Sequence, residues 1–280
     1  MSDLEIRSGG VSLAGARSGE EEGPAIVLLH GLTATRRYVV MGSMALQRGG
    51  MSVLAYDARG HGHSSPAPAR AYGYEHLTAD LAAVIRTTGT SPVILAGASM
   101  GAHTALRFTL EHRAQVAGLA LITPSFLPGE RADERELARW DELARGLREG
   151  GVDGFVRAYD LDGVPGRWRG TVETVLRQRL SAHDHPEAVA DALEVVPRSS
   201  PFESLSQLSE VAVPTVVVAS RDGADPGHPL AVGEAYAETI PGAELVVEPS
   251  EDPPRSPIAW QGGQLSGVLL ELAERSDVRT

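Results

Sequence analysis

The sequence feature that most constrains this chain is a five-residue turn, Gly97-Ala98-Ser99-Met100-Gly101. An apolar run at residues 93–96 precedes it and is typical of a buried strand, whereas residues 100–111 after it have helical spacing. In the pattern G-x-S-x-G the serine sits on a strained strand-to-helix turn that exposes its hydroxyl, and the flanking glycines let the backbone close around it. The sequence therefore predicts that Ser99 is a nucleophile.

Short apolar runs alternate with helical patterns along most of the chain, which favours a parallel sheet with crossover helices. We expect strands at residues 25–29, 53–56, 93–96, 119–122, 213–218 and 244–247, and helices at 38–48, 74–88, 100–111 and 264–274. Between residues 125 and 200 no strand run occurs, and charged helical patterns stand at 131–148 and 172–180. The predicted fold class is α/β, a mostly parallel doubly wound sheet. Its core comprises residues 1–124 and 201–280, and residues 125–200 form an inserted helical lid.

Two further motifs follow the first two predicted parallel strands. His30-Gly31 follows the first, and Asp57-Ala58-Arg59-Gly60-His61-Gly62-His63-Ser64 follows the second. Together with the serine turn, they resemble the motifs of the α/β-hydrolase fold superfamily, in particular its serine hydrolases and esterases. The resemblance covers residues 26–124 and 213–270.

The resemblance assigns roles to several of these residues. It implies that the backbone N–H groups of Leu32 and Met100 form an oxyanion hole and that His30 belongs to the loop against the substrate. It also implies that Asp57 and Arg59 act as internal ties of a structural turn.

The resemblance also predicts where the acid of a catalytic triad should lie. The family pattern G-x-x-D-x-x-x-P fits residues 219–226, with Ala219 in place of the first glycine. We favour Asp222 as the acid because it is closer to the predicted strand end. Asp225, which is followed by Pro229 four positions later, is the alternative, and either aspartate could instead organise a turn.

The chain departs from the family at the catalytic histidine. Arg255 stands where that histidine is expected, and arginine cannot act as a general base because it stays protonated. We hypothesise that Arg255 binds a substrate carboxylate. His228 is the only histidine that follows Asp222, and two interpretations of it stay open. It is either a relocated base for Ser99 or a cap at the start of the next helix.

Composition excludes several classes of chemistry. The chain has no cysteine, and all 25 of its basic residues are arginine, so thiolate catalysis, a lysine-bound pyridoxal phosphate and a P-loop lysine are absent. The net charge of -12 argues against nucleic acid as a partner. No apolar run approaches the roughly 20 residues that span a bilayer, and no signal peptide is visible, so a cytoplasmic, bacterial protein with no membrane partner is expected. The histidine pairs at 61/63 and 183/185 lack a third ligand, so we expect no metal and no cofactor.

The sequence thus predicts a serine hydrolase that acts through Ser99 on a small carboxylic ester, thioester or lactone. One alternative is a lyase, isomerase or cyclase of the same fold that binds a carbonyl substrate with Ser99 and the oxyanion hole. The other is a non-catalytic ligand-binding protein. Five aromatic residues of the predicted lid are candidates for the pocket wall: Phe126, Trp140, Phe155, Tyr159 and Trp168. The sequence says nothing of the oligomeric state.

Overall fold

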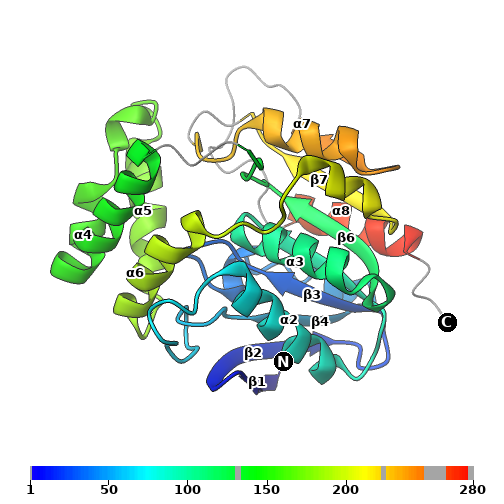
Figure 1. Cartoon of the computed structure of the whole chain (residues 1–280). Helices are drawn as coiled ribbons and strands as arrows, with labels where there is room; N and C mark the ends of the chain where they lie inside the picture. Colours follow the sequence, from blue (N-terminus) through cyan, green and yellow to red (C-terminus); the bar gives the residue numbers. More distant parts are fainter. Residues whose placement is uncertain (1, 130–133, 222–224, 249–262, 277–280) are drawn as a thin grey trace.

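The structure of this chain is a computed structural model, and it describes residues 2–129, 134–221, 225–248 and 263–276. Figure 1 shows a central sheet with helices on both faces and a group of helices beyond one end of it. The strands are β1 (Ser2–Ser8), β2 (Val11–Gly19), β3 (Ala25–Leu29), β4 (Ser52–Tyr56), β5 (Val93–Ala98), β6 (Val116–Ile122), β7 (Thr215–Ala219) and β8 (Glu244–Val247).

The sheet is mostly parallel, as predicted. Its strand order is β1-β2-β4-β3-β5-β6-β7-β8, and the six strands from β4 to β8 run parallel. β1 and β2 form an antiparallel hairpin that pairs with β4 at one edge. The sequence analysis missed this hairpin because its strands are short of apolar residues, and β1 is mostly exposed at the sheet edge.

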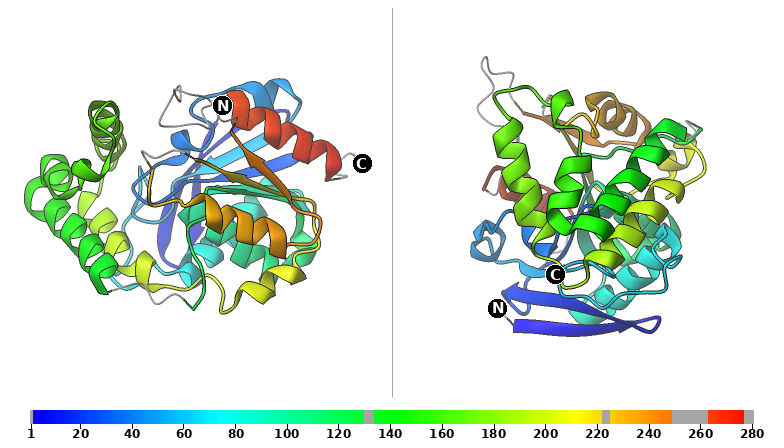
Figure 2. Two further views of the ribbon diagram at one scale, coloured as in Figure 1. Left: turned by 90° about the horizontal axis from the view of Figure 1, so that it is seen from above. Right: turned by 90° about the vertical axis from the view of Figure 1, so that its left-hand side faces the viewer.

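Helices cover both faces of the sheet, which confirms the doubly wound arrangement (Figure 2). α1 and α8 pack on one face, and α2, α3 and α7 pack on the other. The bounds are α1 (Ala45–Arg48), α2 (Tyr74–Thr88), α3 (Met100–Glu111), α7 (Leu230–Thr239) and α8 (Gly263–Arg275). The helix expected at 38–48 is wrong in extent. Only a 3-10 turn at Arg36–Tyr38 and the single turn of α1 form there, because Met41 and Gly42 have positive φ angles.

Three further helices stand together beyond the carboxyl end of the sheet, on the left of Figure 1. They are α4 (Glu134–Ala158, kinked at Gly151), α5 (Arg169–Leu180) and α6 (Pro186–Val195). They share a hydrophobic cluster of their own, which includes Leu147, Phe155 and Leu193. The sequence analysis did not predict α6, and the proposed lid boundaries at 125 and 200 stay a prediction. Short 3-10 turns complete the described elements at Arg113–Gln115, Leu161–Gly163, Val196–Arg198 and Leu205–Glu210.

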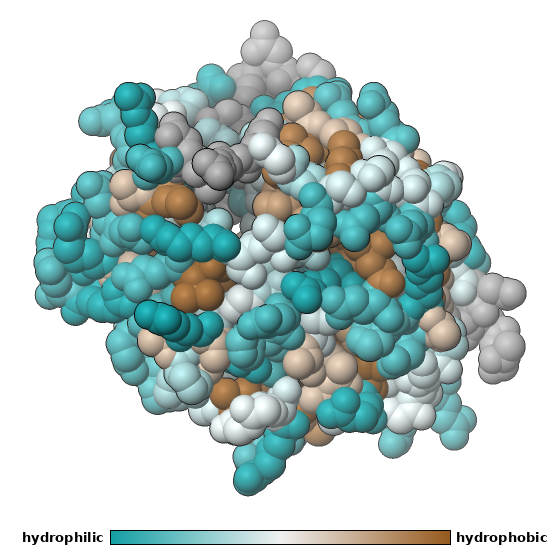
Figure 3. Space-filling model, viewed as in Figure 1, coloured by the Kyte–Doolittle hydropathy of each residue, from teal (hydrophilic) through white to brown (hydrophobic). Residues whose placement is uncertain are grey.

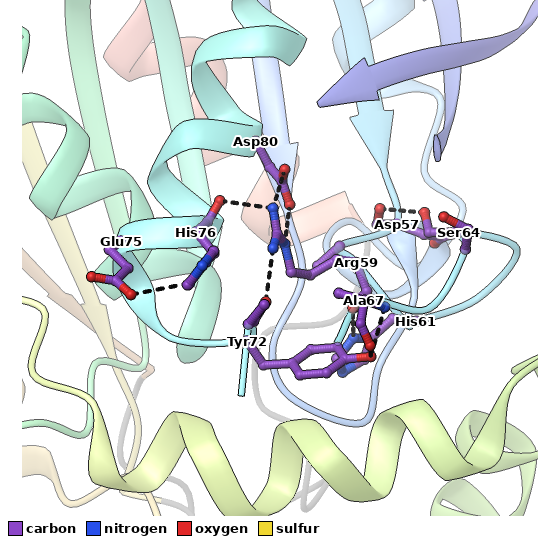
Figure 4. A network of polar contacts seen from close by, with 12 residues as sticks. Asp57, Arg59, His61, Ser64, Ala67, Tyr72, Glu75, His76 and Asp80 are labelled. Atoms are coloured by element: carbon purple, nitrogen blue, oxygen red, sulfur yellow. Dashed lines mark hydrogen bonds and ion pairs between the residues drawn. The ribbon is translucent and has the colours of Figure 1, made fainter. Parts of the chain in front are cut away.

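The turn that follows β4 is held by internal polar contacts, as expected for Asp57 and Arg59 (Figure 4). The buried Arg59 guanidinium binds both carboxylate oxygens of Asp80 in α2, each at 2.7 Å. Asp57 forms an ion pair with Arg36, and the Ser64 hydroxyl donates to the Asp57 carbonyl at 2.7 Å. These contacts confirm that the two residues are internal ties of the core.

In the part of the chain that the structure describes, no helix is both long enough and apolar enough to cross a membrane. The face seen in Figure 3 is mostly hydrophilic, and its apolar residues form small separate patches.

Candidate active site

Ser99 occupies a sharp bend between the end of β5 and the start of α3. Its backbone has φ 51° and ψ -114°, a conformation that is strained for a residue with a side chain. The two flanking glycines are required by close packing. A Cβ on Gly97 would lie 2.2 Å from the carbonyl oxygen of Gly101, and a Cβ on Gly101 would lie 2.4 Å from that of Leu29. The local sequence therefore places the serine hydroxyl on a rigid turn at the carboxyl edge of the sheet.

A histidine from a distant loop contacts this hydroxyl. His228 lies between β7 and α7, and its Nε2 is 2.8 Å from Ser99 Oγ. On the other side of the ring, Nδ1 is 2.8 Å from both carboxylate oxygens of Asp225. Since a carboxylate can only accept, Nδ1 carries the proton of the neutral ring and Nε2 accepts from the serine hydroxyl. The three side chains form a continuous chain from carboxylate to nucleophile.

Asp225 and His228 are brought together by a tight turn. The His228 backbone N–H donates to the Asp225 carbonyl at 3.2 Å, so the two side chains leave the turn three residues apart and meet. Burial works to raise the pKa of the Asp225 carboxyl, but the hydrogen bond from His228 and the charges of His228 and Arg179 outweigh it and lower that pKa. Asp225 therefore stays ionised at neutral pH and can stabilise an imidazolium on His228.

The sequence analysis preferred Asp222 as the acid, and Asp222 lies outside the described residues. The carboxylate that contacts His228 is that of Asp225, the alternative. The preference for Asp222 therefore stays a prediction. Arg255 also lies outside the described residues.

The interpretation of His228 as a helix cap is wrong. Pro229 holds the N-cap position of α7, and no side chain caps this helix. Both ring nitrogens of His228 are used instead by Ser99 and Asp225.

The two amides expected to form the oxyanion hole flank the serine turn. Met100 is the first residue of α3, where a backbone N–H has no partner within the helix. The loop that carries Leu32 packs tightly on the turn, since a Cβ on Gly31 would lie 3.2 Å from the Cβ of Ser99. Among the described residues, neither amide donates a hydrogen bond to a carbonyl of another loop or turn. Both groups are thus available to a ligand.

His30 lines the cavity beside Ser99, but its ring is already engaged. Nδ1 donates to the Gly31 carbonyl at 2.8 Å, and Nε2 accepts from the Ala58 amide at 2.9 Å. Burial lowers the pKa of His30 to about 3, so the ring is neutral. His30 therefore shapes the wall and holds the loop, and its ring has no hydrogen-bonding group left for a substrate.

His103, four residues after Ser99 on α3, has a similar structural role. Its Nε2 accepts from the amides of Ser125 and Phe126 at 3.1 and 3.3 Å, and its Nδ1 is 3.0 Å from the Tyr74 hydroxyl. Burial, with a smaller contribution from the His228 charge, lowers the pKa of His103 to about 3. A neutral His103 thus anchors the chain that leaves β6.

Ser99, His228 and Asp225 open into one cavity of about 250 Å³. Its walls are mainly apolar and come from the ends of β5 and β6, from α5 and α8, and from the loops at the carboxyl ends of the strands. Tyr159 is the one of the five aromatic candidates that lines it. Phe126 packs against the sheet core instead, and Trp140 and Phe155 belong to the α4–α6 cluster. The sequence analysis did not identify Arg179 and Tyr38, which also line the cavity and carry no motif.

The residues described by the structure include no group of three or more His, Cys, Asp or Glu side chains that could hold a metal ion. The three buried histidines His30, His61 and His183 lie near one another, with ring centroids 5.2 and 5.6 Å apart. Both ring nitrogens of His30 and of His183 are committed to backbone groups, so these rings have no free ligand atom.

Comparison with known proteins agrees with this fold. Residues 20–152 match the family model described as serine aminopeptidase, S33. The chain is 36% identical over 100 residues to mouse sn-1-specific diacylglycerol lipase ABHD11, covering 35% of this chain and 32% of that protein. It is 33% identical over 127 residues to epoxide hydrolase A of Mycobacterium tuberculosis, covering 44% of this chain and 38% of that protein. The matched region thus spans about a third of the length of these two relatives.

A solved structure of a thermophilic esterase from Thermogutta terrifontis, with malate bound, matches over 99% of both chains. The TM-score is 0.78 and the sequence identity is 25%. The fold, the serine turn and these matches show that the chain has the α/β-hydrolase fold.

Proposed function

We propose that this chain is a serine hydrolase that cleaves a small carboxylic ester, thioester or lactone, with Ser99, His228 and Asp225 as its catalytic triad. The observation that carries the proposal is the 2.8 Å contact between His228 Nε2 and Ser99 Oγ, on a ring whose Nδ1 is held by Asp225. A serine hydroxyl is a weak nucleophile until such a base removes its proton. In this proposal the catalytic histidine belongs to the loop after β7. A histidine at the usual position in the family, where this chain has Arg255, is then not required.

The geometry supports a two-step acyl transfer. Ser99 Oγ attacks the substrate carbonyl while His228 Nε2 takes the hydroxyl proton, and the Asp225 carboxylate stabilises the imidazolium. The Leu32 and Met100 amides bind the oxyanion that forms, and one such donor contributes roughly 3 kcal/mol in other enzymes. The imidazolium then protonates the leaving alcohol or thiol. A water molecule, deprotonated by the same Nε2, then attacks the acyl carbonyl. The bond between this carbonyl and Ser99 Oγ breaks, the proton returns from Nε2 to Ser99 Oγ, and the acid product leaves.

The cavity supports a small substrate. A volume of about 250 Å³ is below the roughly 300–1,000 Å³ of pockets that hold drug-sized ligands. Its mainly apolar wall suits the hydrocarbon part of an acyl group.

Reaction with a fluorophosphonate probe tests the proposal, because this reagent labels only a serine that a base activates. We expect mass spectrometry to find the label on Ser99 of the wild-type protein and no label on the Ser99→Ala and His228→Ala variants. His63→Ala is the matched control, because the exposed His63 side chain pairs with Asp184 and takes no part in the proposed triad, so this variant should label like the wild type.

Failure of the wild type to label would contradict the triad. It would favour the alternative in which Ser99 and the oxyanion hole only polarise a carbonyl for a lyase, isomerase or cyclase reaction. Undiminished labelling of His228→Ala would remove His228 from the mechanism.

A further inference from the structure

Arg179 is the one arginine among the described residues that line the cavity, and no described carboxylate pairs with it. It lies in the last turn of α5, on the side of the helix that faces the cavity. By contrast, the buried guanidinium of Arg59 is held by Asp80, and the partly buried guanidinium of Arg36 is held by Asp57. A cation placed in an apolar wall without an anionic partner is costly unless a ligand supplies the anion.

The hydrogen bonds of Arg179 leave part of its guanidinium unused. Nη2 donates to the Leu32 carbonyl at 2.9 Å and to the Thr33 hydroxyl at 3.1 Å. Nε is buried and has no hydrogen-bond partner. No described residue accepts from Nη1 either. Nη1 therefore has no described acceptor, on a side chain that lines the same cavity as Ser99.

The groups around Arg179 do not neutralise it. Its Cζ lies 6.0 Å from the centroid of the Tyr38 ring, a weak cation–π contact. Burial lowers the pKa of the guanidinium, and only the charge of Asp225 and the hydroxyls of Tyr38 and Tyr159 oppose this. Asp225 is already bound through both oxygens to His228. A monoanionic ligand would thus be the direct partner of the Arg179 guanidinium, because Asp225 is already paired with His228.

We propose that Arg179 binds a carboxylate of the substrate, so that this hydrolase acts on esters, thioesters or lactones whose acyl part ends in a second, ionised carboxyl group. This inference rests on the proposed function. It predicts a specificity-determining contact from α5, which joins the described helices beyond the sheet to the site. A monoanion fits better than a phosphate dianion, because a single guanidinium faces it and Asp225 stands nearby.

The test compares two esters that differ only in charge. Monomethyl glutarate and methyl 5-methylhexanoate have the same shape, since an isopropyl group replaces the carboxylate. Hydrolysis followed in a pH-stat gives kcat/KM for each. We expect wild-type protein to prefer the acidic ester, and the Arg179→Met substitution to lower the acidic-to-neutral ratio by at least about tenfold, as expected for loss of a charge-assisted hydrogen bond. Arg179→Lys should restore part of the ratio because it keeps the charge without the planar fork.

Arg177→Met is the matched control. Arg177 lies two residues away on α5, but it points to solvent and pairs with Asp153 and Glu173. The acidic-to-neutral ratio of kcat/KM in Arg177→Met should equal that of the wild type. An unchanged ratio in Arg179→Met, with both esters affected alike, would show that Arg179 only supports the Leu32 loop, and it would overturn the proposal.

A binding measurement separates this inference from the proposed hydrolase activity. Calorimetric titration of glutarate into the Ser99→Ala variant requires no catalysis. We expect binding that the additional Arg179→Met substitution weakens at least about tenfold, and much weaker binding of inorganic phosphate to Ser99→Ala. Equal glutarate affinity with and without Arg179, or no glutarate binding at all, would refute the carboxylate site even if the triad is active.

Discussion

The two halves of the candidate site are built in different ways. The serine turn is rigid because the backbone itself is packed, and a single Cβ on Gly97 or Gly101 would collide with a carbonyl oxygen. The described part of the loop that supplies the base, residues 225–229, is less tightly packed. The Asp225 side chain is 48% exposed, and among the described residues a Cβ on Gly227 would meet only Asp225 Oδ1, at 4.0 Å. The nucleophile is thus positioned by backbone packing, and the base by a few side-chain hydrogen bonds.

The comparison predicts that both halves are equally necessary for catalysis, although only one of them is tightly packed. The largest effects are expected for Ser99→Ala and His228→Ala. Each should lower kcat/KM for a simple ester by roughly 10⁴- to 10⁶-fold, because either change removes the activated nucleophile. The double variant should be no worse than the more impaired single variant. Steady-state assays of the three proteins measure this, and a loss below tenfold in His228→Ala would break the proposed pairing.

The next effect concerns the carboxylate that orients the base. Asp225→Asn should lower kcat/KM by roughly 10³- to 10⁴-fold, because the amide cannot stabilise the imidazolium and disturbs the tautomer of His228. Asp222→Asn is the matched control, and we expect its activity to stay within about threefold of wild type, because the proposed triad assigns the role of the acid to Asp225. A larger loss of kcat/KM in Asp222→Asn than in Asp225→Asn would show that Asp222, which the sequence analysis favoured, is the catalytic acid.

A Gly→Ala substitution should lower the free energy of unfolding much more in the serine turn than in the loop that carries the base. Gly101→Ala places a Cβ 2.4 Å from the Leu29 carbonyl oxygen, and we expect it to lower the free energy of unfolding by about 3 kcal/mol. Gly227→Ala places a Cβ 4.0 Å from Asp225 Oδ1, an ordinary contact distance, and its unfolding free energy should change by less than about 0.5 kcal/mol. Urea denaturation of the two variants measures the contrast. Similar values would mean that the serine turn relaxes more readily than its packing indicates.

The last predicted effect is a pH dependence of the free energy of unfolding that is caused by His103, on the helix after the serine turn. The pKa of His103 is about 3 in the folded protein, far below the roughly 6.5 of an unfolded histidine. Between these values the unfolded chain binds a proton that the folded protein does not, so the free energy of unfolding falls as the pH falls. From pH 7 to pH 5 this single group should remove about 2 kcal/mol. His103→Gln should reduce the pH dependence by that amount in urea denaturation at the two pH values, and an unchanged dependence would mean that His103 titrates normally.

Local patterns were enough to predict the elements that carry the nucleophile. Helix α2 (Tyr74–Thr88) and helix α3 (Met100–Glu111) have the predicted bounds, and β5 ends at the serine turn as expected. These elements are long or strongly apolar, so their periodicity is clear. The short segment after Thr35 was predicted less well, because positive φ angles at Met41 and Gly42 interrupt a helix that its side chains alone would allow.

Side-chain direction could not be predicted in the same way. The sequence placed two aspartates and a histidine on one loop and left open both the choice of acid and the role of the histidine. In the structure, the turn from Asp225 to His228 brings these two side chains into contact with each other, and it brings His228 into contact with a serine 129 residues away. Arg179 showed no signal at all in the sequence, since an unpaired guanidinium becomes apparent only when its surroundings are known.

The sequence by itself therefore determined the parallel sheet, the strained serine turn and the absence of thiol and lysine chemistry. These depend on residue type and on spacing over a few residues. Only the tertiary structure decided which carboxylate faces the base and which cation faces the cavity. Those contacts join segments far apart in the chain, and their energies depend on distance, direction and exclusion of water, which no local pattern encodes.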